Sequence, residues 1–131
     1  MWLLKTEPSA YSYDDLERDG RAVWDGVSNP VALKNLAAMK AGERVILYHT
    51  GDEKSAVGIA EVVRAAYPDP KARNPKLVVV DLKPVARLAK PVSLATIKSL
   101  PLFAESPLVR QGRLSVVALS AAQWKALAGD R

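Results

Sequence analysis

Four short polar runs stand where predicted strands end or irregular segments begin, and two of them contain an aromatic residue. They are Lys5-Thr6-Glu7-Pro8, Trp24-Asp25-Gly26-Val27-Ser28-Asn29, Tyr48-His49-Thr50 and Gln111-Gly112-Arg113-Leu114-Ser115. Pockets for planar rings need this mixture, because an aromatic face stacks on the ring while fixed donors and acceptors bind its edge. Stacking contributes about 1–3 kcal/mol for a nucleobase and tolerates any base. Hydrogen bonds at the ring edge would therefore have to supply selectivity.

Trp24 is the aromatic residue on which this hypothesis depends. It stands just before the turn dipeptide Asp25-Gly26, and Asn29-Pro30 then indicates the start of a helix. From this pattern alone, a role in the core and a role as a stacking surface are equally well supported.

Catalysis is not indicated by the sequence. The chain has no cysteine and one histidine, His49, which no G-x-S-x-G elbow or paired metal-ligand spacing accompanies. The seven glycines are scattered and form no phosphate-binding loop. We therefore predict no catalytic residue, no metal and no cofactor, and we interpret His49 as a hydrogen-bonding residue at a strand end.

Charge is distributed unevenly along the 131 residues, which is a length typical of one domain. Residues 1–60 carry seven Lys and Arg against nine Asp and Glu, whereas residues 61–131 carry twelve against five. A basic half can bind a polyanion such as nucleic acid, or it can serve solubility alone. No apolar run approaches the ~18 residues of a membrane span, so we expect a cytoplasmic protein with no membrane partner.

Local signals predict helices and strands in the order β-α-α-β-β-β-α-β-α. Ser12, Asn29, Ser93 and Ser120 are predicted to begin the helices, and Gly58 suggests a bulge or bend. The predicted strands are Trp2–Lys5, Arg44–Thr50, Ser55–Tyr67, Leu77–Val85 and Arg113–Ala118. Because strands and helices do not alternate as in a parallel α/β sheet, a small bent or closed sheet with helices at its ends fits better.

Several long motifs in this order resemble the EVE-domain family of PUA-like folds. They are W-L-L-K-T-E-P-S, Y-S-Y-D-D-L, W-D-G-V-x-N, M-K-A-G-E-R-V-I-L-Y-H-T, G-I-A-E-V-V-R-A-A-Y-P-D-P, K-P-V-S-L-A-T-I-K and R-Q-G-R-L-S-V. The resemblance runs from Trp2 to about Trp124. It implies one α+β domain over residues 1–131, a bent or closed mixed β-barrel of about five to six strands with peripheral helices, close to the YTH domains that bind methylated adenine.

The resemblance also implies a pocket for a base flipped out of DNA or RNA, with Trp24 as its aromatic wall. Core packing then becomes the less favoured role for Trp24. The other residues expected in the pocket are Lys5, Thr6, Glu7, Asp25, Val27, Asn29, Tyr48, His49, Thr50, Arg113, Leu114 and Ser115. On charge alone, the candidates for phosphate contacts are Arg64, Lys71, Arg73, Lys76 and Arg110.

The function that we expect is a non-catalytic reader of a methylated or hydroxymethylated nucleobase. The alternatives are a general PUA-type RNA-binding module without preference for a modified base and, less favoured, a small hydrolase or nuclease that uses His49. Relatives commonly carry arginine and an aromatic residue where this chain has Ser28 and Pro30, and tryptophan near Leu77. The resemblance therefore implies a weaker or different aromatic cage here.

Overall fold

The computed structural model describes residues 1–129, and within them the chain forms six strands and five α-helices. The strands are β1 (Trp2–Thr6), β2 (Ala22–Trp24), β3 (Arg44–His49), β4 (Ser55–Pro68), β5 (Val78–Ser93) and β6 (Val116–Ala118). The helices are α1 (Tyr13–Asp19), α2 (Pro30–Ala38), α3 (Leu94–Ser99), α4 (Pro107–Arg110) and α5 (Ala121–Ala128), with a 3₁₀ turn, η1, at Pro101–Phe103.

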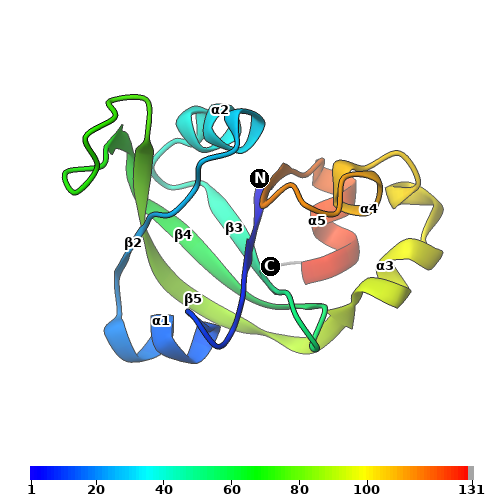
Figure 1. Cartoon of the computed structure of the whole chain (residues 1–131). Coiled ribbons are helices and arrows are strands. Elements are labelled where there is room, and N and C mark those ends of the chain that lie inside the picture. The colour runs from blue at the N-terminus through cyan, green and yellow to red at the C-terminus, as the bar shows by residue number, and fades with distance from the viewer. Residues whose placement is uncertain (130–131) are drawn as a thin grey trace.

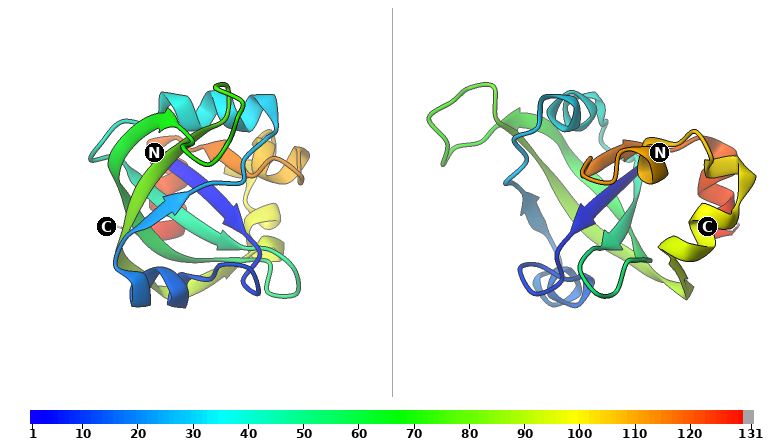
Figure 2. Two further views of the ribbon diagram at one scale, coloured as in Figure 1. Left: turned by 60° about the vertical axis from the view of Figure 1, so that its left-hand side comes forward. Right: turned by 45° about the vertical axis from the view of Figure 1, so that its right-hand side comes forward.

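The six strands form one mixed sheet in the order β2-β5-β4-β3-β1-β6. Strands β3, β4 and β5 follow one another as an antiparallel meander, whereas β1 lies parallel to β3. The sheet curls strongly into a half-barrel, with α1 and α2 at opposite ends and the C-terminal helices grouped on one side (Figures 1 and 2). This architecture confirms the predicted α+β fold class.

Helix starts follow the capping residues that the sequence indicated. The Ser12 side chain accepts the Asp15 amide hydrogen, and the Asp15 carboxylate accepts the Ser12 amide hydrogen. Ser120 and Gln123 form the same capping box at α5, and the Asn29 side chain accepts two amide hydrogens at the start of α2. Each such cap is worth about 1 kcal/mol, so these boundaries are fixed by local chemistry.

Gly58 bends β4 where the sequence predicted a bulge. The register between β4 and β5 shifts between Ala56 and Gly58. A Cβ atom at Gly58 would lie 2.4 Å from a ring carbon of Tyr13, whose hydroxyl donates a hydrogen bond to the Ile59 carbonyl at 2.8 Å. The glycine therefore leaves room for an aromatic ring to pack against the curled strand.

Three strand predictions differ from the structure. Strand β2 was not predicted, β5 continues to Ser93 instead of ending at Val85, and β6 begins at Val116 instead of Arg113. The predicted end of β5 was wrong, and the observed strand contains prolines at 84 and 91. Beyond Leu82, β5 pairs with β4 alone, and a strand paired on one side only can accommodate proline.

The core fills the concave space of the curled sheet and contains residues from all six strands. Helix α2 packs against β4, β5 and β6, and α1 packs against β5. The Leu119 amide donates a hydrogen bond to the Met1 carbonyl at 2.9 Å, which joins the first residue to the segment after β6. Within residues 1–129, no helix has the length and apolar character needed to cross a membrane.

Candidate functional site

A hollow of about 450 Å³ opens at the ends of β1 and β2. The antiparallel pairing of β1 with β6 and the segment after β2 bring three of the four polar runs close to one another. We call this hollow the aromatic pocket. The predicted pocket residues that line it are Lys5, Thr6, Glu7, Trp24, Asp25, Val27 and Ser115.

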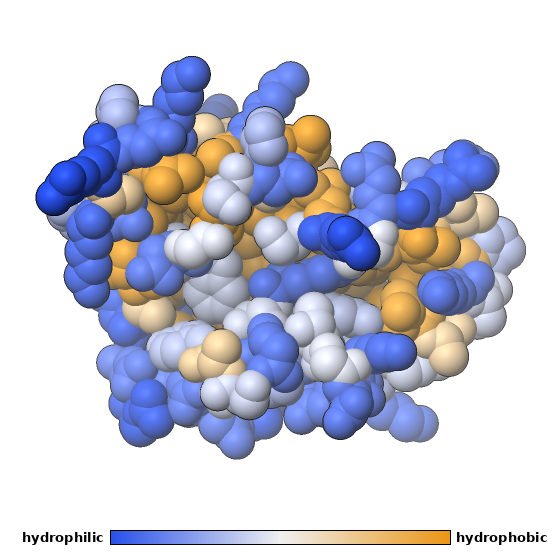
Figure 3. Space-filling model, in the orientation of Figure 1, coloured by the Kyte–Doolittle hydropathy of each residue, from blue (hydrophilic) through white to orange (hydrophobic). Residues whose placement is uncertain are grey.

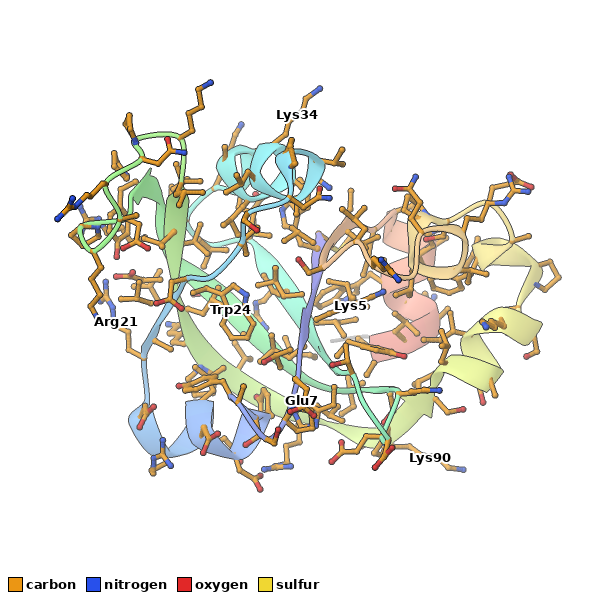
Figure 4. The ribbon with its side chains drawn as sticks, in the orientation of Figure 1. Lys5, Glu7, Arg21, Trp24, Lys34 and Lys90 are labelled. Atoms are coloured by element: carbon orange, nitrogen blue, oxygen red, sulfur yellow. The ribbon has the colours of Figure 1, made fainter. Side chains whose placement is uncertain are left out.

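The aromatic pocket lies in the middle of the face seen in Figures 3 and 4. Pale residues of intermediate hydropathy occupy the centre of this face, with hydrophobic surface above and to the right of them and hydrophilic side chains around the outline (Figure 3). Lys5, Glu7 and Trp24 lie near the centre, whereas Lys34 and Lys90 lie toward the edges (Figure 4). The pocket therefore combines aromatic surface with charged groups at one opening.

Trp24 belongs to the core and also lines the aromatic pocket. It pairs with Val80 of β5, and only 8% of its surface is exposed. The Tyr11 ring stands edge-on to it, with the ring centroids 6.0 Å apart and the planes at 82°. Core packing is thus the larger part of the role of Trp24, and the more exposed Tyr11 adds a second aromatic surface to the pocket.

Lys5 and Thr6 are held in place by backbone oxygens. The Lys5 ammonium donates a hydrogen bond to the Gly112 carbonyl at 2.9 Å, and it lies 5.7 Å from the centre of the Tyr48 ring. Burial lowers the pKa of Lys5 from its ordinary value. The Thr6 hydroxyl donates to the Tyr11 carbonyl at 2.6 Å. An ammonium has three donors, so Lys5 keeps donors for a ligand.

Two carboxylates stand at the rim of the aromatic pocket. One oxygen of Glu7 accepts hydrogen bonds from the amide, at 2.9 Å, and from the hydroxyl of Ser9. Asp25 is exposed, and within residues 1–129 its side chain makes no hydrogen bond or ion pair. Asp25 is therefore free to accept a hydrogen bond from a ligand.

His49 does not line the aromatic pocket, although it was predicted there. It is 7% exposed, its Nε2 accepts the Tyr13 amide hydrogen at 3.0 Å, and its Nδ1 lies 2.6 Å from the Glu53 carboxylate. Because Nε2 must offer a lone pair to an amide, the hydrogen of the neutral ring lies on Nδ1 and is donated to Glu53. Both ring nitrogens are thus engaged within the protein, and His49 fastens the start of α1 to the turn between β3 and β4.

The remaining predicted pocket residues line neighbouring hollows. Asn29, Arg113 and Leu114 line a hollow of about 310 Å³ between α2 and the segment before β6. Tyr48 and Thr50 line a smaller one, which Lys5 also reaches. The structure therefore distributes the predicted site over three adjoining hollows. No three His, Asp or Glu side chains gather as a possible metal site in the part of the chain that the structure describes.

The predicted phosphate contacts lie outside the aromatic pocket. Arg64 stacks on the Tyr67 ring, 3.7 Å from its centre, and Arg110 forms an ion pair with Glu105 at 2.6 Å. Lys71, Arg73 and Lys76 belong to the β4–β5 loop, which projects from the sheet (Figures 1 and 2). Lys76 shares a separate groove with α2. Nothing in this geometry joins these cations to the aromatic pocket.

Sequence reasoning missed four residues of the aromatic pocket: Ala10, Tyr11, Val23 and Gly26. Tyr11 was not among the predicted pocket residues. Its place next to the run Lys5-Thr6-Glu7-Pro8 was the available signal for a role in the pocket. Val23 could not be placed because β2 itself was not predicted.

Known proteins resemble this chain in sequence and in fold. Human thymocyte nuclear protein 1 is 32% identical over 124 residues, covering 75% of this chain and 55% of that protein, so the chain spans about half the length of the curated relatives it matches. An NMR structure of a Rhodopseudomonas palustris protein has a TM-score of 0.91 and 41% identity, covering 97% of this chain and 89% of that one.

A third comparison concerns a complex. The crystal structure of human thymocyte nuclear protein 1 with DNA that contains 5-methylcytosine has a TM-score of 0.88 and 28% identity, covering 95% of this chain and 93% of that chain. The family model described as the EVE domain matches residues 1–129. The match extends over the whole curled sheet and its helices, and it confirms the resemblance seen in the motifs. This chain belongs to the EVE-domain family.

Proposed function

We propose that this chain is a nucleic-acid-binding module whose aromatic pocket receives a single flipped-out base, and that this base is 5-methylcytosine. The aromatic pocket itself is the observation that carries the proposal. Its volume of about 450 Å³ lies within the range of about 300–1,000 Å³ that is usual for small-molecule sites. A base that leaves its stack loses stacking energy, which contact with the Tyr11 and Trp24 rings would partly restore.

The charged groups of the pocket complement the edge of cytosine. Cytosine offers an amino donor beside two acceptors, and Asp or Glu is the usual partner of that amino group. Asp25 is a free acceptor and Lys5 is a donor on the same pocket. Thymine presents a carbonyl in place of the amino group and would meet the Asp25 carboxylate with two acceptors facing each other.

The solved complex of human thymocyte nuclear protein 1 supports the choice of ligand. That protein shares the fold of this chain and was crystallised with DNA containing 5-methylcytosine. The net charge of +5 is of the sign that favours association with a polyanion. The proposal makes no use of His49, because both of its ring nitrogens are already engaged.

The test compares three single-stranded oligonucleotides that differ at one base: cytosine, 5-methylcytosine or thymine. The pair of 5-methylcytosine and cytosine isolates the methyl group, whose burial contributes about 0.8 kcal/mol, or about fourfold in affinity. The pair of 5-methylcytosine and thymine isolates the ring edge, because both carry the methyl group. We expect 5-methylcytosine to bind most tightly in fluorescence anisotropy titrations, with RNA versions as a parallel series.

Asp25→Ala is the variant that tests the edge contact. It should reduce the preference for 5-methylcytosine over thymine and leave the preference over cytosine unchanged. Asp52→Ala is the matched control, because it removes the same charge from an exposed aspartate that does not line the aromatic pocket. Equal affinity of the wild type for all three oligonucleotides would instead identify a PUA-type module without preference for a modified base.

A further inference from the structure

A second pocket adjoins the aromatic pocket and shares Lys5 with it. We call it the lysine pocket, and its volume is about 200 Å³. Lys5 comes from β1, Lys54 from the turn between β3 and β4, and Lys98 from α3. The rest of its wall is formed by Tyr48, Thr50, Gly51, Leu94, Leu108, Val109 and Gly112. Three cations from three distant parts of the sequence therefore converge on one small hollow.

None of the three lysines forms an ion pair within residues 1–129. Among the residues that the structure describes, no acidic residue lines the lysine pocket, although the Glu7 carboxylate lies against Gly51 in its wall. Within residues 1–129, the side chains of Lys54 and Lys98 make no ion pair or hydrogen bond. Glu53 lines an adjoining hollow with both lysines, and its carboxylate contacts His49 without forming an ion pair with either lysine. The three lysines that line the pocket repel one another, and an anionic ligand between them would relieve this repulsion.

The backbone holds Lys54 in an unfavourable conformation at this place. Its φ is 44°, and it is the one residue other than glycine with positive φ in the described part of the chain. The Lys54 carbonyl accepts the Leu94 amide hydrogen at 2.7 Å, which fixes the turn against the end of β5 where α3 begins (Figure 1). Glycine or asparagine would be the ordinary choice at such a position. Strain of this kind is characteristic of functional positions.

We propose that the lysine pocket binds a backbone phosphate next to the base held in the aromatic pocket. This inference rests on the proposed function, because it places a second part of the same nucleic-acid strand. Lysine contributes a compact charge with several donors, which suits a phosphate oxygen whatever the base. The pocket is also less than half the volume of the aromatic pocket, which favours a phosphate over a second base. Because Lys5 lines both pockets, it would contact the strand between base and phosphate.

The competing location for phosphate is the β4–β5 loop with Lys71, Arg73 and Lys76, which the sequence suggested. That loop projects away from the sheet (Figure 2) and shares no residue with the aromatic pocket. Its cations can attract nucleic acid from a distance without fixing the strand. The two locations predict different effects when equal charge is removed from each.

The experiment compares two double variants that each remove two positive charges. Lys54→Gln with Lys98→Gln alters the lysine pocket, and Lys71→Gln with Lys76→Gln alters the loop. Affinity for the 5-methylcytosine oligonucleotide is measured over a series of salt concentrations. The lysine-pocket variant should lower the slope of log affinity against log salt by about one, with the same fold loss for cytosine, 5-methylcytosine and thymine. The loop variant should keep the slope of the wild type.

The outcomes separate this inference from the proposed function. If the wild type binds none of the oligonucleotides, the proposed function is wrong. If the wild type binds with base preference but the lysine-pocket variant keeps the full slope, the phosphate is bound elsewhere and this inference alone is overturned. Equal losses from the two double variants would also overturn it, because they would reveal a diffuse charge effect without a local site.

Discussion

The aromatic pocket and the lysine pocket share Lys5 but are built in opposite ways. The wall of the aromatic pocket is a core residue, since Trp24 is almost fully buried and pairs with the sheet. The lysine pocket gains its charge from exposed side chains, Lys54 and Lys98. A change in the first therefore affects folding as well as binding, whereas a change in the second leaves the core intact.

The largest expected difference between the two pockets is in stability. Trp24→Ala should lower the free energy of unfolding by about 3–5 kcal/mol, because it removes a buried aromatic side chain. Lys98→Ala should stay within about 0.5 kcal/mol of the wild type. Urea unfolding followed by circular dichroism measures both. Trp24→Phe, which keeps a ring in the core, should lose less than Trp24→Ala; equal losses would argue against the core role.

A substitution at Lys54 is expected to change the free energy of unfolding by a smaller amount and in the opposite direction. Lys54→Gly should raise the free energy of unfolding by about 1 kcal/mol, because glycine adopts positive φ without the strain of a side chain. The same variant should weaken binding to all three oligonucleotides. Urea unfolding and anisotropy titrations on the same preparations compare the two effects. Stability that falls in Lys54→Gly would show that the turn depends on contacts of the lysine stem.

The smallest effect is expected at high pH and concerns the aromatic pocket. Burial, followed by the hydrogen bond to Asp19, raises the pKa of Tyr11 to about 12. Because the unfolded chain ionises nearer the ordinary value of 10.0, the stabilisation is complete below pH 10 and is lost as the pH rises toward 12. Tyr11→Phe should remove this part of the pH dependence. The free energies of unfolding of wild type and variant are measured in urea at pH 9 and pH 11. Their difference should change between the two pH values, and solvent screening keeps this change small.

Wild type and Tyr11→Phe should share part of the loss of stability at high pH, and this shared part serves as the internal control. Tyr13, Tyr48 and Tyr67 also have raised pKa values, chiefly from burial for the first two and from the hydrogen bond to Asp81 for Tyr67. These tyrosines are present in both proteins, so their contributions cancel in the difference between the two free energies of unfolding. A difference that does not change with pH would contradict the role assigned to the Tyr11 hydroxyl.

Local chemistry explains which parts of the fold were predictable from sequence. The capping boxes at Ser12 and Ser120 involve residues three positions apart, so the sequence displays them directly. Strand β2 has three residues and exists through its pairing with β5, as between Trp24 and Val80. No periodicity can appear in so short a segment. Its position was therefore visible only in the folded chain.

The same distinction applies to the candidate site. The polar runs and Trp24 were found because each is a cluster within a few residues of sequence. The lysine pocket was not found, because Lys5, Lys54 and Lys98 belong to separate elements that meet through the parallel pairing of β1 and β3 and the return of the chain at α3. Charge counting pointed instead to the β4–β5 loop, where basic residues are close in sequence.

The two hydrogen bonds of His49 have a consequence for the entropy of binding. One bond holds the first residue of α1, two positions after Tyr11, and the other holds Glu53, next to Lys54. A single buried ring thus ties together the segments that flank the two pockets. Folding has already ordered both segments before a ligand arrives, and a preorganised site loses less conformational freedom on association. In this chain, the only histidine therefore contributes to the order of the segments beside both pockets.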